Sequence, residues 1–473
     1  MQYNCPYTLQ LPQLFSPMKD RKRHLTFCKG FVCRATFIMC ICCLNLATLI
    51  PLPLYANGTA AYRTHVGNGQ IKTLRMDYAD RHALQRPFLI LSENGIVDGS
   101  EISNRLLISF DELSHEARHY TYTLYHLNWD HTPSDLQSSE YLKGFTTADI
   151  TDYELSNNTQ QLYTHYWFEF PNEDMQLIKS GNYVIHIYED GDPDKMVADV
   201  CFRVVEPLSE VGMTIRPNTD IELNGRYQQV DISLDLKSLP YVNPQEITVV
   251  VEQNNRTDNR VILTRPTYVE PTRLKYEREQ SLIFEGGNEY RHFDLFSVYY
   301  AGFNVNRIRY ERPYYHAFLE QDENRGADRH STDKTGKPYL FEYDSNGQWV
   351  VNAENTDYDD VDGDYMWVHW VLPMPESFFD GSIYVSGDLF NNEMNLTNRM
   401  SYDNESHCYY LNAYLKQGAY DYQYWFCPKG ERTATLQRTE GSHWQTNNRY
   451  SAAVYYRPLG GRYDRLIGYL VVE

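Results

Sequence analysis

The chain has 473 residues, 42% hydrophobic and 22% charged, which excludes wholesale disorder and predicts roughly two to four domains. Aromatic residues reach 14%, with 41 tyrosines, and aromatic side chains suit pleated sheets. The net charge of −20 argues against nucleic acid and anionic lipid surfaces as partners, because phosphate contacts need clustered cations.

Residues 1–56 have the pattern of a secretory leader. They carry six basic residues and one acidic residue, and an apolar run, ATFIMCICCLNLATLI, occupies residues 35–50. Two prolines end this run, and the small residue Ala56 follows. Basic, apolar and small segments in that order predict a cleaved signal segment. The alternative is a retained membrane anchor.

Residues 62–206 are predicted to form a first β-sandwich. Apolar and polar residues alternate with a period of two at 106–110, 120–124, 166–170, 183–187 and 200–204. Turn residues separate these stretches, which is typical of antiparallel strands with one buried face. About seven short strands over this length predict an immunoglobulin-like sandwich.

Residues 207–355 are predicted to form a second β-sandwich. Residues 230–234 and 247–251 alternate in the same way, and the polar, glycine-containing stretch 321–336 predicts a loop. An acidic segment, NTDYDDVDGDY (355–365), predicts a solvated linker. A third sandwich is predicted over residues 356–473, where YMWVHWVL (365–372) is apolar on both faces, as a central strand should be. The chain's end is predicted to belong to this third unit.

Residues 408–427 predict a β-hairpin with a two-residue turn at Gln417-Gly418. This register gives one apolar face and sets Cys408 opposite Cys427. Facing Cα atoms in such a pair lie ~4.5–5.5 Å apart, within the ~4.4–6.8 Å that a disulfide needs. We therefore predict a cross-strand disulfide, with two buried thiols as the alternative. Cys201 is the one other cysteine after the leader, which excludes a disulfide-rich scaffold and a Cys-rich zinc site.

Sequence motifs for catalysis, cofactors or metals are not recognisable. The chain has no G-x-S-x-G, no H-E-x-x-H, no P-loop and no Rossmann glycine pattern. His115, His119, His126 and His131 lie close together in sequence, but a strand sends successive side chains to opposite faces, so we predict structural roles. The acidic segment fails the calcium-loop spacing when Gly363 is its sixth residue. We predict no enzyme, no cofactor and no metal site; a hydrolase with a carboxylate pair remains an alternative.

Several segments of all three predicted domains carry a family resemblance. They are SFDEL (109–113), YTYTLYHLNWD (120–130), SGNYVIHIYED (180–190), EQNNRTDN (252–259), GGNEYRHFDL (286–295), YDSNGQW (343–349), GDYMWVHWVL (363–372) and LKQGAYDYQYW (415–425). Together they resemble, in order and over almost the whole chain after the leader, the type IX secretion system plug protein family of the Bacteroidetes.

This resemblance implies a non-enzymatic protein of the periplasm. Members of the family sit on the periplasmic opening of a large outer-membrane translocon barrel and seal it while it is not engaged with cargo. The implied partner is that barrel protein, with no nucleic acid and no small-molecule substrate. The acidic charge after the leader would suit a basic surface on the barrel.

The third predicted domain also resembles early-set sandwiches that bind glycogen-type glucans, through IYVSGDLFN (383–391) and the predicted hairpin. In those modules exposed tryptophans stack on sugar rings. Tyr410 and Trp425 share the hairpin face away from the predicted core and are candidates for such contacts, with packing between sheets as the alternative. A carbohydrate-binding multi-sandwich protein of a periplasmic or surface glycan-utilisation system is therefore the alternative function.

Overall fold

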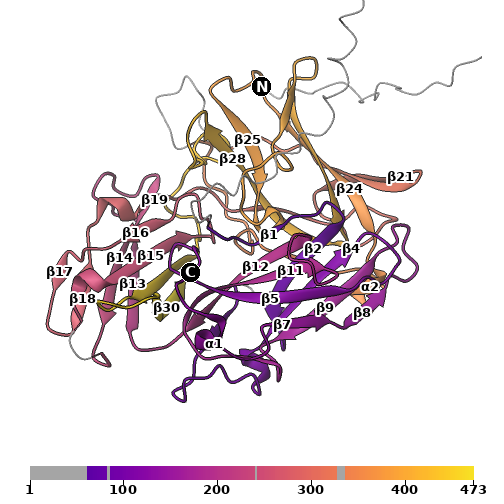
Figure 1. The fold of residues 1–473 in the computed structure, drawn as a ribbon. Helices are drawn as coiled ribbons and strands as arrows, with labels where there is room; N and C mark the ends of the chain where they lie inside the picture. Colours follow the sequence, from indigo (N-terminus) through magenta and orange to yellow (C-terminus); the bar gives the residue numbers. More distant parts are fainter. Residues whose placement is uncertain (1–60, 83–85, 240–241, 327–335) are drawn as a thin grey trace, which may run out of the picture. The chain divides into compact units, whose positions relative to one another are not determined.

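The computed structural model describes residues 61–82, 86–239, 242–326 and 336–473, and it is built of β-sheets that are mostly antiparallel (Figure 1). The predicted leader, residues 1–56, lies outside the described residues. Within these described ranges, three large hydrophobic cores can be distinguished, and each lies against two main sheets. No helix in these ranges has the length and hydrophobicity needed to cross a bilayer.

The first core is built from residues 71–204. The alternation read from the sequence is confirmed: Leu106, Ile108 and Phe110 are fully buried, and the other four predicted stretches bury the same alternate positions. One sheet has the order β1 (His65–Val66), β12 (Met196–Val205), β11 (Gly181–Glu189), β5 (Tyr120–Leu127) and β7 (Thr147–Ile150), with β3 (Phe88–Ile90) beside β12. The other has the order β2 (Ile71–Tyr78), β4 (Leu106–Glu112), β9 (Thr164–Phe170) and β8 (Asp152–Leu155), and β6 (Leu142–Gly144) pairs with β10 (Met175–Leu177).

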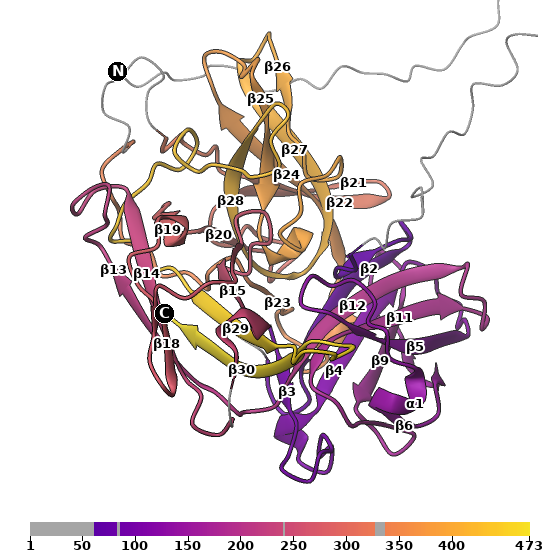
Figure 2. The ribbon, with the colours of Figure 1, turned by 60° about the vertical axis from the view of Figure 1, so that its left-hand side comes forward.

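The middle core joins segments that are far apart in the sequence. One sheet has the order β13 (Glu210–Arg216), β14 (Tyr227–Asp235), β18 (Arg273–Tyr276) and β17 (Tyr268–Val269), with β19 (Ile283–Glu285) beside β14. The other has the order β16 (Val261–Leu263), β15 (Ile247–Gln253), β29 (Tyr450–Tyr456) and β30 (Arg465–Val472). Figure 2 shows the last two strands beside β15. The end of the chain therefore completes the middle sheet instead of joining the third unit.

The third core lies between two further sheets. The first has the order β21 (Val305–Glu311), β22 (Tyr314–Leu319), β24 (Tyr365–Pro373), β27 (Cys408–Lys416) and β26 (Ser401–Asp403). The second has the order β20 (Arg291–Asp294), β28 (Gly418–Pro428) and β23 (Trp349–Val351), with β25 (Gly381–Ser386) beside β28. β20, β22 and β23 thus pair with strands from beyond residue 356, so the strand pairing crosses the predicted domain limit at 355.

Helical segments are short. They are α1 (Ser138–Tyr141), α2 (Asp359–Asp362) and the 3-10 turns η1 (Ile102–Asn104), η2 (Pro244–Glu246), η3 (Gln280–Leu282) and η4 (Asp388–Phe390).

The acidic segment around α2 is not the solvated linker that we predicted. Asp360 forms an ion pair with Arg75 of β2, with 3.1 Å between Oδ1 and Nη2, and Asp359 Oδ1 accepts a hydrogen bond from the Ala353 N–H. This segment therefore packs against the first core.

The predicted hairpin of residues 408–427 is wrong. β27 pairs with β24 and β26, whereas β28 pairs with β20, β23 and β25, so the two consecutive strands lie in different sheets. Gly418 is the first residue of β28, and an added Cβ would lie 2.1 Å from the Val350 carbonyl oxygen. The glycine serves a close backbone approach here and not a tight turn. Two strands with matching apolar faces suit a hairpin and a sandwich crossing equally, which is why the pattern misled.

The facing geometry on which the disulfide was predicted is consequently missing. Cys408 pairs with Pro373 and Asp403, and Cys427 pairs with Ser382. The Cys408 Sγ lies 3.2 Å from the Ser406 carbonyl oxygen, and the Cys427 Sγ contacts the Pro428 and Glu431 carbonyls. The structure, which describes both residues, contains no bond between their sulfur atoms.

Candidate functional site at the joints between the cores

The two aromatic candidates do not form a common binding face. Trp425 is fully buried, and the Arg256 guanidinium lies over its ring at 4.1 Å from the centroid. Tyr410 is half-buried in the other sheet of the third core, and its hydroxyl contacts that of Ser406. Because the face of the Trp425 ring is covered, this tryptophan offers no stacking surface to a sugar.

The histidines singled out in the sequence also take separate places. His126 is buried, with Nδ1 2.9 Å from the Ser134 hydroxyl and Nε2 3.1 Å from the Ser180 carbonyl. His119 lies 3.2 Å from the Asp149 carboxylate. Across the part of the chain that the structure describes, no group of three or more His, Cys, Asp or Glu residues has an arrangement that could hold a metal ion.

The joint between the first and third cores is a buried ion pair. Asp111 of β4 and Lys416 of β27 have no exposed side-chain surface, and 2.6 Å separates Oδ2 from Nζ. The Tyr365 hydroxyl donates to the same oxygen at 2.6 Å, and His165 Nδ1 lies 2.6 Å from Oδ1. Lys416 also donates to the Asp360 carbonyl of α2. This network satisfies both buried charges, as buried charges require.

The pKa of Asp111 reflects these partners. Burial alone would raise the pKa of a carboxyl group, but the charges and hydrogen bonds of Lys416 and His165 outweigh burial and hold the Asp111 pKa below its ordinary value. The carboxylate therefore stays ionised at neutral pH. Burial lowers the pKa of its partner Lys416, and the negative charge of Asp111 opposes that decrease.

The joint between the first and middle cores combines apolar packing with a second buried ion pair. Arg203 of β12 donates to Glu252 of β15, with 2.9 Å between Nη2 and Oε2. The backbone N–H of Trp129 donates to Asp464, which also binds Arg457. A small apolar cluster surrounds these contacts and contains Val205, Val250, Ala453, Tyr455 and Leu466.

The joint between the middle and third cores is centred on Arg256, just after β15. Its guanidinium binds Asp258 at 2.8 and 3.0 Å, donates to the Ala434 carbonyl at 3.0 Å, and covers Trp425. Glu285 of β19 adds hydrogen bonds from the Thr435 hydroxyl and the Leu436 N–H. The same pattern of a covered charge with several donors or acceptors thus occurs at all three joints.

Three carboxylates beside this region have raised pKa values. Burial raises the pKa of Asp421 to about 7, although its carboxylate accepts hydrogen bonds from the Ser345 and Gly347 N–H groups. The nearby negative charges of Asp344 and Asp388 add to the increase. Burial likewise raises the pKa of Asp344 and Asp388. These groups titrate within the folded protein and make its stability depend on pH.

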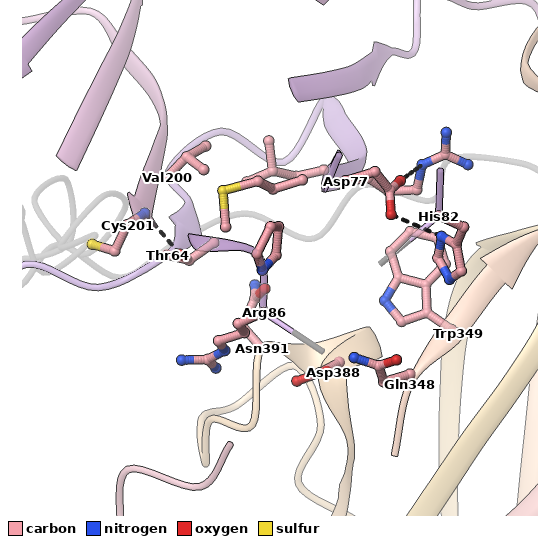
Figure 3. Close-up of a pocket in the computed structure, with 14 residues that line it drawn as sticks. Thr64, Asp77, His82, Arg86, Val200, Cys201, Gln348, Trp349, Asp388 and Asn391 are labelled. Atoms are coloured by element: carbon pink, nitrogen blue, oxygen red, sulfur yellow. Dashed lines mark hydrogen bonds and ion pairs between the residues drawn. The ribbon is translucent and has the colours of Figure 1, made fainter. Parts of the chain in front are cut away.

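A cavity of about 110 Å³ lies between the sheets of the first and third cores. Figure 3 shows Asp77 paired with His82 at 2.8 Å and the Cys201 N–H donating to Thr64. Trp349 and Asp388 also line this cavity. Pockets for small molecules usually have volumes of ≈ 300–1,000 Å³, so this cavity is too small for such a ligand.

Sequence reasoning missed the residues of the joints. Asp111, Glu252, Arg256 and Lys416 nevertheless all lie in the segments that carry the family resemblance. These residues are charged and lie inside or beside apolar strands. This pattern could have indicated buried ion pairs, because a charge in a strand that is buried on one face needs a partner.

The sheets, cores and joints together define a multi-domain all-β protein whose buried charges hold its parts together. Residues 71–206 match the model of the type 9 secretion system plug protein first domain. The chain is also similar to a solved hypothetical protein from Parabacteroides merdae, with 35% identity and a TM-score of 0.81 over 87% of this chain and 99% of that one. The chain belongs to the type 9 secretion system plug protein family, and membership implies a structural, non-catalytic role.

Two further comparisons add nothing to this assignment. The B domain of a biofilm-associated protein matches over 87% of this chain and 89% of that one, with 7% identity and a TM-score of 0.17, which is too low to carry an argument. No curated protein matches the chain.

Proposed function

We propose that this protein is a non-enzymatic periplasmic plug that seals the periplasmic opening of the outer-membrane translocon barrel of the type IX secretion system. The observation that carries the proposal is the family match over residues 71–206, together with the 35% identical relative that matches almost end to end. The leader at 1–56 would direct export, after which the chain would associate with the barrel from the periplasmic side.

A seal needs a body that keeps its form under load, and the joints supply this property. Buried charges connect the three large cores: the pairs Arg203–Glu252 and Asp111–Lys416 link the first core to the middle and third cores, and the buried Arg256 of the middle core contacts the Ala434 carbonyl and the Trp425 ring. Breaking one partner of such a pair is costly, since it leaves a charge without compensation. The three cores would therefore move together and not as loosely tethered modules.

We also propose a domain division that follows the cores. The first domain keeps the predicted limits, 62–206, as an immunoglobulin-like sandwich. The second would combine 207–285 with the returning strands β29 and β30, and the third, of the early-set type, would comprise the sheets between 286 and 428. The support is the strand pairing of β15 with β29 and of β22 with β24.

The carbohydrate-binding alternative is less well supported. The outer face of the sheet around β22 and β24 carries aromatic residues, but their rings cover one another. Phe318 and His369 stack with centroids 4.5 Å apart, and Arg307 lies over the Phe318 ring at 4.6 Å. A sugar ring stacks only on an open aromatic face. Here His369 and Arg307 cover the Phe318 ring.

The plug proposal is tested by purification from native membranes. A tagged full-length chain should co-purify with a very large outer-membrane barrel protein, and deletion of the chain should let small periplasmic solutes leak out. If the tagged chain retrieves no barrel and the deletion leaves the permeability barrier unchanged, the proposal is wrong. Increased salt should weaken the complex if the acidic surface meets a basic rim.

A further inference from the structure

A hollow of about 400 Å³ opens where the loop 157–160 meets the loop 296–300 and the segment 353–356. Its floor is fixed by hydrogen bonds. The Gln417 side chain donates to the Phe296 carbonyl at 2.7 Å and accepts from the Asp364 N–H at 2.8 Å. Asp364 in turn accepts from the Gln160 N–H at 2.6 Å. The hollow is therefore preformed, with walls from both the first domain and the third core.

The charged residues that line this hollow are all acidic. Glu354, Asp362 and Asp364 line it, and its lining residues include no lysine, arginine or histidine. Asp362 bonds to the Thr356 hydroxyl and the Asn157 amide, and Asp364 to backbone N–H groups. In the described ranges of the chain, none of the three carboxylates forms an ion pair. This contrasts with Asp111, Glu252 and Asp258 at the joints, each of which pairs with a cation.

Exposed aromatic rings lie in and near the hollow. Tyr299 is 84% exposed and Tyr300 56%, and both line it. Phe303, Tyr310 and Tyr358 are also exposed in adjacent segments, and the Tyr310 hydroxyl lies 3.2 Å from the Gln160 side-chain oxygen. Tyrosine is enriched at the energetic centres of protein interfaces, and clustered exposed rings mark interaction surfaces.

We propose that this hollow, the acidic hollow, is the docking surface for the translocon barrel, which inserts a lysine or arginine side chain beside Tyr299 and Tyr300. The inference rests on the proposed plug function. The carboxylates supply negative charge that complements a positively charged side chain. The faces of tyrosine rings attract a cation within ≈ 6 Å of the ring centroid. A partner seated here touches the first and third cores together, whose spacing the Asp111–Lys416 pair fixes.

The test is quantitative co-purification of the barrel with full-length tagged variants. Tyr299→Ala with Tyr300→Ala, and separately Glu354→Lys, should each reduce the retrieved barrel about tenfold or more, because each removes one element of cation binding. Tyr299→Phe with Tyr300→Phe keeps the rings and should retain the barrel. Glu354→Gln should bind less and depend less on salt than the wild type, since the charge is removed without a change in size.

Matched surface variants control for nonspecific loss. Tyr343→Ala removes a tyrosine that is 86% exposed outside the hollow, and Glu405→Lys reverses an exposed charge; both should retain the barrel. Thermal unfolding confirms that each variant is folded. If the wild type and all variants retrieve the barrel equally, the plug function stands and this docking surface is wrong. If the wild type retrieves none, both proposals fall.

Discussion

Asp111 and Lys416 are 305 positions apart in the sequence and form an ion pair of 2.6 Å that is closed to solvent on both sides. Their contact connects β4 of the first core to β27 of the third core through side chains alone. Isolated charges are costly to bury, so the two residues depend on each other, and on Tyr365 and His165, for their stability.

Lys416→Met should therefore destabilise the protein strongly. It preserves most of the side-chain volume but leaves the Asp111 carboxylate buried without its cation, at a cost of ~3–5 kcal/mol in the free energy of unfolding. Urea unfolding measures the loss. The double variant Asp111→Asn with Lys416→Met should recover much of it, while Lys429→Met, at an exposed lysine, should change stability by about 0.5 kcal/mol or less. A Lys416→Met protein as stable as the Lys429→Met control would contradict the role of the pair.

Asp421 gives the protein a pH dependence of the opposite sign to that of an ion-paired carboxylate. Its folded pKa of about 7 lies above its unfolded value, so the folded state binds the proton more tightly. This group's contribution to stability is therefore full below about pH 4 and is lost as the pH rises towards about 7. As the pH rises over this range, the free energy of unfolding of Asp421→Asn should increase relative to that of the wild type, by an amount on the order of 1–4 kcal/mol. Denaturant unfolding at a series of pH values measures the difference, and a difference that stays constant with pH would count against the raised pKa.

Arg256 should resist even conservative replacement. Its planar guanidinium binds Asp258 with two nitrogens while it covers Trp425, and an ammonium cannot do both. Arg256→Lys should lower the free energy of unfolding by ~1–3 kcal/mol, and Arg256→Met by ~3–5 kcal/mol. Arg432→Met, at an exposed arginine, serves as the control. Chemical denaturation followed by circular dichroism measures the series, and equal stability of the Lys variant and the wild type would refute the bidentate role.

Cys408 and Cys427 should not form a disulfide in the folded protein, because their strands belong to different sheets. Proteolysis of the folded protein, purified without reductant, followed by mass spectrometry, should yield no peptide pair that is joined through these two residues. Recovery of such a pair would show that the strands are arranged as a hairpin after all.

The sequence allowed the strands of the first core to be predicted, because residues such as Leu106 and Phe110 alternate with polar neighbours and both are buried. It did not reveal which strands pair. Periodicity identifies a buried face but not the partner strand, so β29 could not be matched to β15, almost 200 residues earlier. The residues of the joints could not be predicted for the same reason. A charged residue in a buried strand requires a partner, but the sequence does not identify which residue that partner is.

The return of β29 and β30 to the middle sheet has a consequence for biogenesis. β29 and β30 are synthesised well after β15, so one edge of β15 lacks its partner strand until this later part of the chain has left the ribosome. Topologies with distant partners fold slowly, and open edges invite aggregation. We expect this protein to depend on a chaperone that shields nascent strands, and we expect removal of β29 and β30 to disrupt the middle sheet.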